Sequence, residues 1–217
     1  YSRSHAWMRV SHLGDKAKLK AMGEEYGKVK KLLKNRGARI FRRDCLELEV
    51  RSHGSLLTVF VCHFKSMSGG DSETVGRRQL EALAVKRIIE EKFSDPVGAN
   101  WLIVGDLNDY RQYVHVSGSR RDAEGCPVET VKKKTSKTSG LDPLLKDGFA
   151  VNLLERRPED DQWTHYYAAK RWKTQLDYIL ASPALAATND KTPRIIRAGQ
   201  PLRIPNTEHI QRFPLIG

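Results

Sequence analysis

Three places in the chain carry polar side chains directly after, or inside, an apolar run that is typical of a buried strand. The first is His63, the second is the pair Asp106 and Asn108, and the third is Asp177. Strand ends hold side chains rigidly where a cleft can open, so the three places could converge in one site. An acid and an amide two positions apart point the same way on an extended chain. Such a pair can accept a proton, hold a water or help to hold a hard cation.

Each of these residues also has an ordinary structural explanation. His63 could be a turn residue bonded to backbone, and Asp106 could cap the start of a turn. Asp177 could be a half-exposed strand residue. Taken singly, the structural explanations are favoured, and only the combination indicates a functional site.

The elements that must position these residues alternate between strands and helices. Cys45–Arg51 alternates strictly between apolar and polar residues, and Leu56–Cys62 is a buried-strand run that follows a short turn. The two are expected to form a hairpin. Apolar spacing and stop signals further predict an amphipathic helix over 15–35 (Met22, Tyr26, Val29, Leu33), helices over Thr74–Phe93 and Leu141–Gly148, and strands over Trp101–Val104, Gln175–Leu180 and Arg194–Arg197. This order predicts a mixed-sheet α/β protein.

One domain is expected to cover residues 1–217, because the length suits a single α/β core. Residues 117–140 are rich in Gly, Ser, Lys and Arg, and they predict a mobile basic surface insertion.

The composition is strongly basic, with 38 Lys and Arg against 26 Asp and Glu, a net charge of +12 and a pI near 9.7. Such a surface favours polyanions such as nucleic acid, acidic lipid headgroups or phosphorylated metabolites, although the charge could serve solubility only. Three cysteines make neither a disulfide framework nor a metal-binding spacing, and Cys45 and Cys62 are expected to be small buried hydrophobes. With no transmembrane stretch in the sequence, a cytoplasmic protein without membrane insertion is expected.

Taken in order, the motifs resemble those of the endonuclease/exonuclease/phosphatase superfamily, a group of metal-dependent phosphoesterases that includes deoxyribonucleases. Val61–Ser66 is similar to the family's histidine-bearing strand end, and Gly105–Asn108 matches its Gly-Asp-x-Asn signature. Leu176–Leu180 matches its Leu-Asp-Tyr-Ile-Leu strand, preceded by Trp163-Thr164 as in the family. Gly-Asp-x-Asn by itself is a weak signal, but three motifs in order are a strong one.

The resemblance implies a four-layer α/β/β/α sandwich with mixed, largely antiparallel sheets. It also implies Mg²⁺ (or Mn²⁺) as cofactor and cleavage of a phosphoester by attack of water. In this scheme Asp106 activates the water, and Asn108 holds the water or donates to the phosphate. His63 donates to a phosphate oxygen, and Asp177 orients a second histidine. Lys65 is a further phosphate contact or an exposed loop lysine.

Two parts of the family pattern are not visible in the chain. The principal metal ligand, a Glu on an N-terminal strand, and the C-terminal Ser-Asp-His motif are both expected outside this chain, which would then be incomplete at both ends. Glu208-His209 lacks the residues that flank the family's histidine. The chain is therefore either a piece of an active enzyme, which we favour, or a non-catalytic relative.

A nucleic acid is the expected substrate, because many Lys and Arg contacts could neutralise its backbone. Trp163 and Tyr166 could wedge against a base or sugar, or they could simply pack at the rim of the sheet. The alternatives are a phosphatase or phospholipase of the same superfamily, and a non-enzymatic nucleic-acid-binding module. That module would use the basic helix and the Lys132–Lys137 segment.

Overall fold

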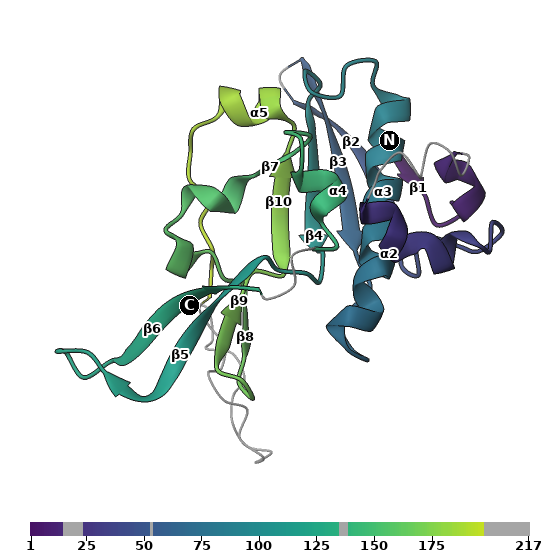
Figure 1. Cartoon of the computed structure of the whole chain (residues 1–217). Coiled ribbons are helices and arrows are strands. Elements are labelled where there is room, and N and C mark those ends of the chain that lie inside the picture. Colours follow the sequence, from purple (N-terminus) through teal and green to yellow (C-terminus); the bar gives the residue numbers. More distant parts are fainter. Residues whose placement is uncertain (15–23, 53, 135–138, 198–217) are drawn as a thin grey trace, which may run out of the picture.

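The structure is a computed structural model that describes residues 1–14, 24–52, 54–134 and 139–197 (Figure 1). Its elements are two β-sheets and several helices, so the expected α/β class is confirmed. The large sheet has the order β1 (Ser2–Ser4), β2 (Cys45–Ser52), β3 (Ser55–His63), β4 (Trp101–Asp106), β10 (Asp177–Ala181) and β7 (Val151–Asn152). The small sheet has the order β6 (Pro127–Lys133), β5 (Gln112–Arg121), β9 (Trp172–Thr174) and β8 (His165–Tyr167). The α-helices are α2 (Glu24–Leu33), α3 (Asp71–Lys92), α4 (Asp142–Leu145) and α5 (Pro183–Thr188), and the 3₁₀ helices are η1 (Val10–Leu13), η2 (Leu153–Arg156) and η3 (Glu159–Asp161).

The large sheet is mixed. β3 and β4 run parallel, whereas every other neighbouring pair in it is antiparallel. Parallel neighbours need a long crossover, and α3 supplies it between them. The predicted β2–β3 hairpin and the predicted α3 helix are both confirmed.

One face of the large sheet forms the core. Phe60, Trp101, Ile103 and Leu180 alternate along their strands and are fully buried. The residues that α3 presents to them include the predicted Leu80, Ala84 and Ile88, which are also buried. Removing each large side chain from water contributes roughly 2 kcal/mol, so this face holds the sheet and α3 together. The predicted burial of Cys45 and Cys62 is confirmed as well.

The opposite face of the large sheet is apolar but open, and we call it the open face. It consists of cross-strand partners that point away from the core: Leu46, Leu48, Val50, Leu57, Val59, Val61, Leu102, Val104 and Ile179. Val61 lies in the middle of this set, between Leu46 and Val104, yet the residue is 37% exposed. Within the described residues, therefore, no layer covers the open face.

The small sheet lies beyond the ends of β4 and β10 and not over a face of the large sheet (Figure 1). It contains most of the segment that the sequence predicted to be a mobile insertion. Residues 117–121 and 127–133 of that segment belong to the two strands of the β5–β6 hairpin and are mostly exposed. Val114 pairs with Val131 across the hairpin and Val116 lies on the same face, and Gly and Lys are tolerated because the hairpin is largely exposed. Residues 135–138 lie outside the described residues.

Two smaller expectations changed. Arg194–Arg197 forms no strand; Arg197 instead donates hydrogen bonds to the carbonyl oxygens of Trp163 and Asp161. The first amphipathic helix is described only from Glu24, so Met22 lies outside the described residues. Among the described helices, none has the length and apolar character that a membrane crossing requires.

Candidate active site

The structure places His63, Asp106 and Asp177 side by side in one row across three adjacent strands. His63 is the cross-strand partner of Asp106, and Asp106 is the partner of Asp177. Directly opposed residues share a face of the sheet. The row therefore lies at one end of the sheet, with its three side chains on a common side.

That side is the open face. His63, Asp106 and Asp177 lie two positions from Val61, Val104 and Ile179 respectively, and side chains two apart on a strand point to the same face. The row thus continues the apolar face into a polar edge.

His63 and Asp106 form a loose, solvent-accessible pair. His63 Nε2 lies 3.6 Å from Asp106 Oδ2, and the two side chains are 47% and 36% exposed. The pKa of Asp106 lies above its ordinary value because partial burial and the charge of Asp177 raise it. The Asn108 backbone N–H, His63 and Arg43 act in the opposite direction. A carboxylate with a raised pKa is a better proton acceptor than a free aspartate.

The turn after β4 requires its glycine and asparagine. Gly105 has φ +131°, and a Cβ there would collide with the carbonyl oxygen of Cys62 on β3. Asn108 has φ 52°, a left-handed conformation that Asn tolerates better than most residues. The Asn108 N–H donates to Asp106 Oδ1 at 2.9 Å, and its side-chain Nδ2 donates to the Phe64 carbonyl at 3.2 Å. Asn108 is only 7% exposed, so its observed contacts hold the turn against β3.

Arg43 belongs to the site although the sequence did not single it out. Its Nη1 donates to the same Phe64 carbonyl at 3.2 Å, and its charge lowers the pKa of Asp106. Arg43 precedes β2, and only the β2–β3 pairing brings it to the end of β3. Charged residues directly before a strand are too common in sequences for Arg43 to have been identified from its position alone.

Asp109 is a second residue that the sequence did not single out, and it anchors the turn from the buried side. It is fully buried and forms ion pairs of 2.9 Å with Arg78 of α3 and with Lys134. Burial by itself would raise the pKa of Asp109, but Lys134 and Arg78 hold it below its ordinary value. The sequence signal was an Arg at a core position of α3, followed by an extra acid after Gly-Asp-x-Asn.

Further bonds tie Asp109 to the rest of the fold. Its Oδ2 accepts from the Gly140 N–H at 2.7 Å, and its backbone carbonyl accepts from the Tyr178 hydroxyl at 2.9 Å. A Cβ on Gly140 would collide with Asp109 and Arg78. Three parts of the fold therefore meet at the buried Asp109: helix α3, strand β10 and the turn that follows β4.

Asp177 is positioned through its backbone. The Thr164 hydroxyl accepts from the N–H groups of Leu176 and Asp177 at 3.1 and 3.0 Å. This explains the Trp-Thr element that precedes the last motif: its threonine holds the start of β10.

The three predicted substrate contacts lie elsewhere. The Lys65 ammonium bonds within its own loop, to Ser66 and to the Ser68 carbonyl. Trp163 lines a cavity and packs against Lys173 and Arg197, whose cationic groups lie 5.0 and 4.1 Å from its ring. Tyr166 is the cross-strand partner of Lys173 and shares its side of the small sheet.

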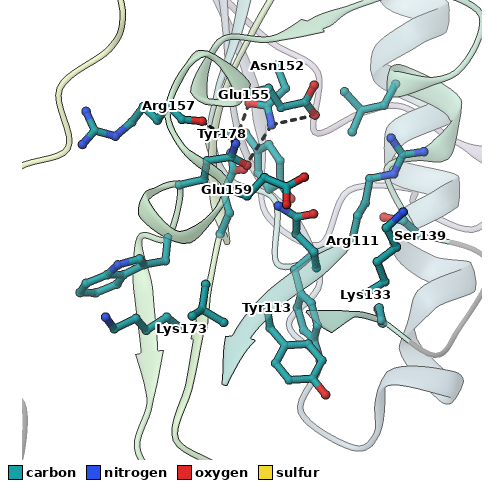
Figure 2. A pocket seen from close by; sticks show the side chains of 18 of the residues that line it. Arg111, Tyr113, Lys133, Ser139, Asn152, Glu155, Arg157, Glu159, Lys173 and Tyr178 are labelled. Carbon is teal, nitrogen blue, oxygen red and sulfur yellow. Dashed lines mark hydrogen bonds between the residues drawn. The ribbon is translucent and has the colours of Figure 1, made fainter. Parts of the chain in front are cut away.

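The cavity has a volume of about 770 Å³ and lies between the small sheet, α4 and η2. Figure 2 shows Arg157 and Lys173 on one side of it and Arg111 and Lys133 on the other. Glu155, bonded to Asn152, contributes acid to its wall. Gln175 and Tyr178, which flank Asp177, also line it, so it adjoins the row from the core side of the sheet.

Within the described residues, no three His, Cys, Asp or Glu side chains form a group that could hold a metal ion. Asp106 and Asp177 nevertheless provide two neighbouring carboxylates, and the charge of one raises the pKa of the other. Oxygen donors of this kind suit Mg²⁺, which usually takes one or two protein carboxylates together with water and substrate phosphate. Glu208 and His209 lie outside the described residues.

Neither a scan against models of known protein families nor a search of curated proteins found a match to this chain.

Proposed function

We propose that the chain is part of a divalent-metal-dependent phosphoester hydrolase that acts on a nucleic-acid backbone. The observation that carries the proposal is the alignment of His63, Asp106 and Asp177 in one row at the end of the open face. The three motifs are separated by more than 40 residues and by a 22-residue helix, so sequence proximity does not explain their alignment. The resemblance and the net charge of +12 point in the same direction.

In the proposed reaction, Asp106 accepts a proton from the attacking water as the water oxygen bonds to phosphorus. The bond to the leaving oxygen breaks on the opposite side. His63, when protonated, donates to a non-bridging phosphate oxygen, where negative charge accumulates. Asp177 keeps the pKa of Asp106 high and, as in the resembling family, would orient a second histidine.

Mg²⁺ (or Mn²⁺), held in part by Asp177, would supply charge stabilisation at the phosphate. The principal ligand would come from outside the described residues. Asn108 and Arg43 act as positioning groups, because both bond the Phe64 carbonyl next to His63.

We also propose the four-layer α/β/β/α arrangement, in which a second sheet packs on the open face. Its support is the apolar, uncovered surface around Val61, since large exposed apolar patches mark places where another layer packs. In the full-length protein, Val61→Lys should then destabilise by roughly 3 kcal/mol or more, because it would bury an unpaired charge. Val97→Lys, on a loop residue of similar exposure, is the control. Equal and small effects in urea unfolding would reject the second layer.

The catalytic proposal is tested by cleavage of plasmid DNA with the full-length protein in Mg²⁺. Asp106→Asn should reduce the rate at least ~100-fold, the usual contribution of a positioned general base. The matched control is Asp147→Asn, which makes the same chemical change at an exposed residue whose φ of 57° suits Asn. Unchanged cleavage in Asp106→Asn would remove the role assigned to it.

A further inference from the structure

One face of the small sheet gathers aromatic and basic side chains, and we call it the aromatic face. Two rows of cross-strand partners define it. His115, Trp172 and Tyr167 form one row, and Lys132, Tyr113, Thr174 and His165 form the next. Because directly opposed residues share a face and rows two apart repeat it, all of these side chains lie on the same side of the sheet.

The reverse face of the small sheet has a different character. Val114 and Val131 are partners on it, and Lys173 forms an ion pair there with Glu129. Val114 and Lys173, which both lie on the reverse face, line the cavity between the small sheet, α4 and η2. The reverse face is thus engaged with the body of the protein, whereas Tyr167 on the aromatic face is 46% exposed.

The rings and cations of the aromatic face are close together. The Tyr113 and Trp172 centroids lie 4.2 Å apart with planes inclined by 32°, and the Lys170 ammonium lies 4.6 Å from the Trp172 centroid. Trp172 and Tyr113 are half-buried and Tyr167 is exposed. Accessible rings beside ammonium groups suit a ligand that has both flat π-surfaces and negative charge.

Charge complementarity identifies the class of ligand. The defining positions of the aromatic face include no Asp or Glu, because Glu129 points to the reverse face. Lys132 and Lys170 present positive charge beside these rings, and no acid occupies a described strand position of this face, within a chain of net charge +12. A polyanion with accessible flat groups is the complementary partner.

We propose that the aromatic face binds single-stranded nucleic acid, with bases stacked on Tyr167 and Trp172 and phosphates paired with Lys132 and Lys170. A duplex is disfavoured because its bases are already stacked on each other and hide their flat surfaces. Trp172 is five residues from Asp177, so the two backbones are at most about 18 Å apart. That distance corresponds to about five nucleotides of stacked strand. The inference rests on the proposed function, since it names the form of nucleic acid that would reach His63, Asp106 and Asp177.

Binding can be measured without cleavage. The full-length protein with EDTA is titrated into a fluorescein-labelled oligothymidylate of about 12 nucleotides, and fluorescence anisotropy is followed. Tyr167→Ala should weaken binding roughly 10-fold, the usual effect of losing one stacked base. Tyr1→Ala removes an exposed tyrosine that precedes β1 of the large sheet and should leave the affinity unchanged.

The charged part of the proposal has a matched pair on one strand. Lys132 and Lys133 are neighbours on β6 and point to opposite faces. Lys132→Ala should reduce the slope of log affinity against log salt by about 1, as for the loss of one phosphate contact. Lys133→Ala should change the slope by less than half as much. Equal effects would show that general basicity, not the aromatic face, attracts the strand.

Other results would overturn the proposal as well. A 12-base-pair duplex or polyglutamate that binds as tightly as the single strand would assign this face to another class of polyanion. Unchanged affinity in Tyr167→Ala would reject the stacking contact. The Asp106→Asn cleavage assay and the Tyr167→Ala binding assay separate the two proposals. If cleavage depends on Asp106 but binding does not depend on Tyr167, the proposed function stands and this inference fails. If binding depends on Tyr167 but the wild-type protein does not cleave, this inference stands and the proposed function fails.

Discussion

Asp109→Asn tests whether the buried ion pairs hold the turn that carries Asp106. The substitution keeps the shape of the side chain and removes its charge. Arg78 is fully buried and Lys134 nearly so, and each lies 2.9 Å from an Asp109 oxygen. The variant would remove the negative charge of Asp109 from both cations, and the Gly140 N–H would face a weaker acceptor.

Breaking a buried ion pair by removing one partner typically costs about 3–5 kcal/mol. Since domains are stable by about 5–15 kcal/mol, the variant should lose a large part of its stability and still fold. With an m-value of about 2 kcal/mol/M, the urea midpoint should fall by about 2 M.

Urea unfolding followed by tryptophan fluorescence measures this effect. Asp147→Asn, the same change at an exposed site, should lie within about 0.5 kcal/mol of the wild type. A double-mutant cycle with Arg78→Met should show coupling of at least ~1 kcal/mol, because the two side chains are in contact. A loss of stability below 1 kcal/mol for Asp109→Asn would refute the reasoning, because the ion pairs of Asp109 would then contribute little to the fold.

Three further predictions follow from other contacts. Burial raises the pKa of Glu81 to about 7 from an ordinary 4.5. The folded state therefore binds a proton that the unfolded state releases, and the free energy of unfolding should fall by about 3 kcal/mol between pH 4.5 and pH 7. Glu81→Gln should flatten that dependence in urea titrations across this range. Gly105→Ala should cost more than about 2 kcal/mol in thermal unfolding, because its Cβ meets the neighbouring strand at a positive φ. Arg43→Ala should move the acid limb of the pH–rate profile to higher pH, because the guanidinium lowers the pKa of Asp106.

Each of these has a matched comparison. Gly125→Ala, at φ +79° with no atom within 4 Å of the added Cβ, should cost only the backbone strain of about 1–2 kcal/mol. Equal losses at Gly105 and Gly125 would contradict the close approach of β3 and β4. Arg42→Ala removes the adjacent exposed arginine and should leave the acid limb in place. If the stability of Glu81→Gln still falls between pH 4.5 and pH 7 as in the wild type, another group is responsible for the titration.

Side-chain periodicity along the chain is enough to predict the elements of the core. β2, β3, α3, β4 and β10 were all predicted near their observed bounds, because burial of one face imposes a period of 2 or 3.6 on the sequence itself. The same logic failed for β5 and β6. Most residues of that hairpin are accessible and Val114 is the buried exception, so too few buried positions repeat to mark the strands, and the Gly, Ser and Lys content resembled a loop.

The sequence by itself determined which groups stand at strand ends: His63, Asp106 with Asn108, and Asp177. Local chemistry explains this, since Gly-Asp-x-Asn dictates its own turn through a positive φ and an Asp106–Asn108 hydrogen bond. Only the tertiary structure decided that they form one row. Register between β3, β4 and β10 is set by the packing of α3 and by the Asp109 ion pairs, which join residues far apart in the chain. For the same reason only the fold placed Arg43 beside Phe64 and Asp106, and Trp172 beside Tyr113.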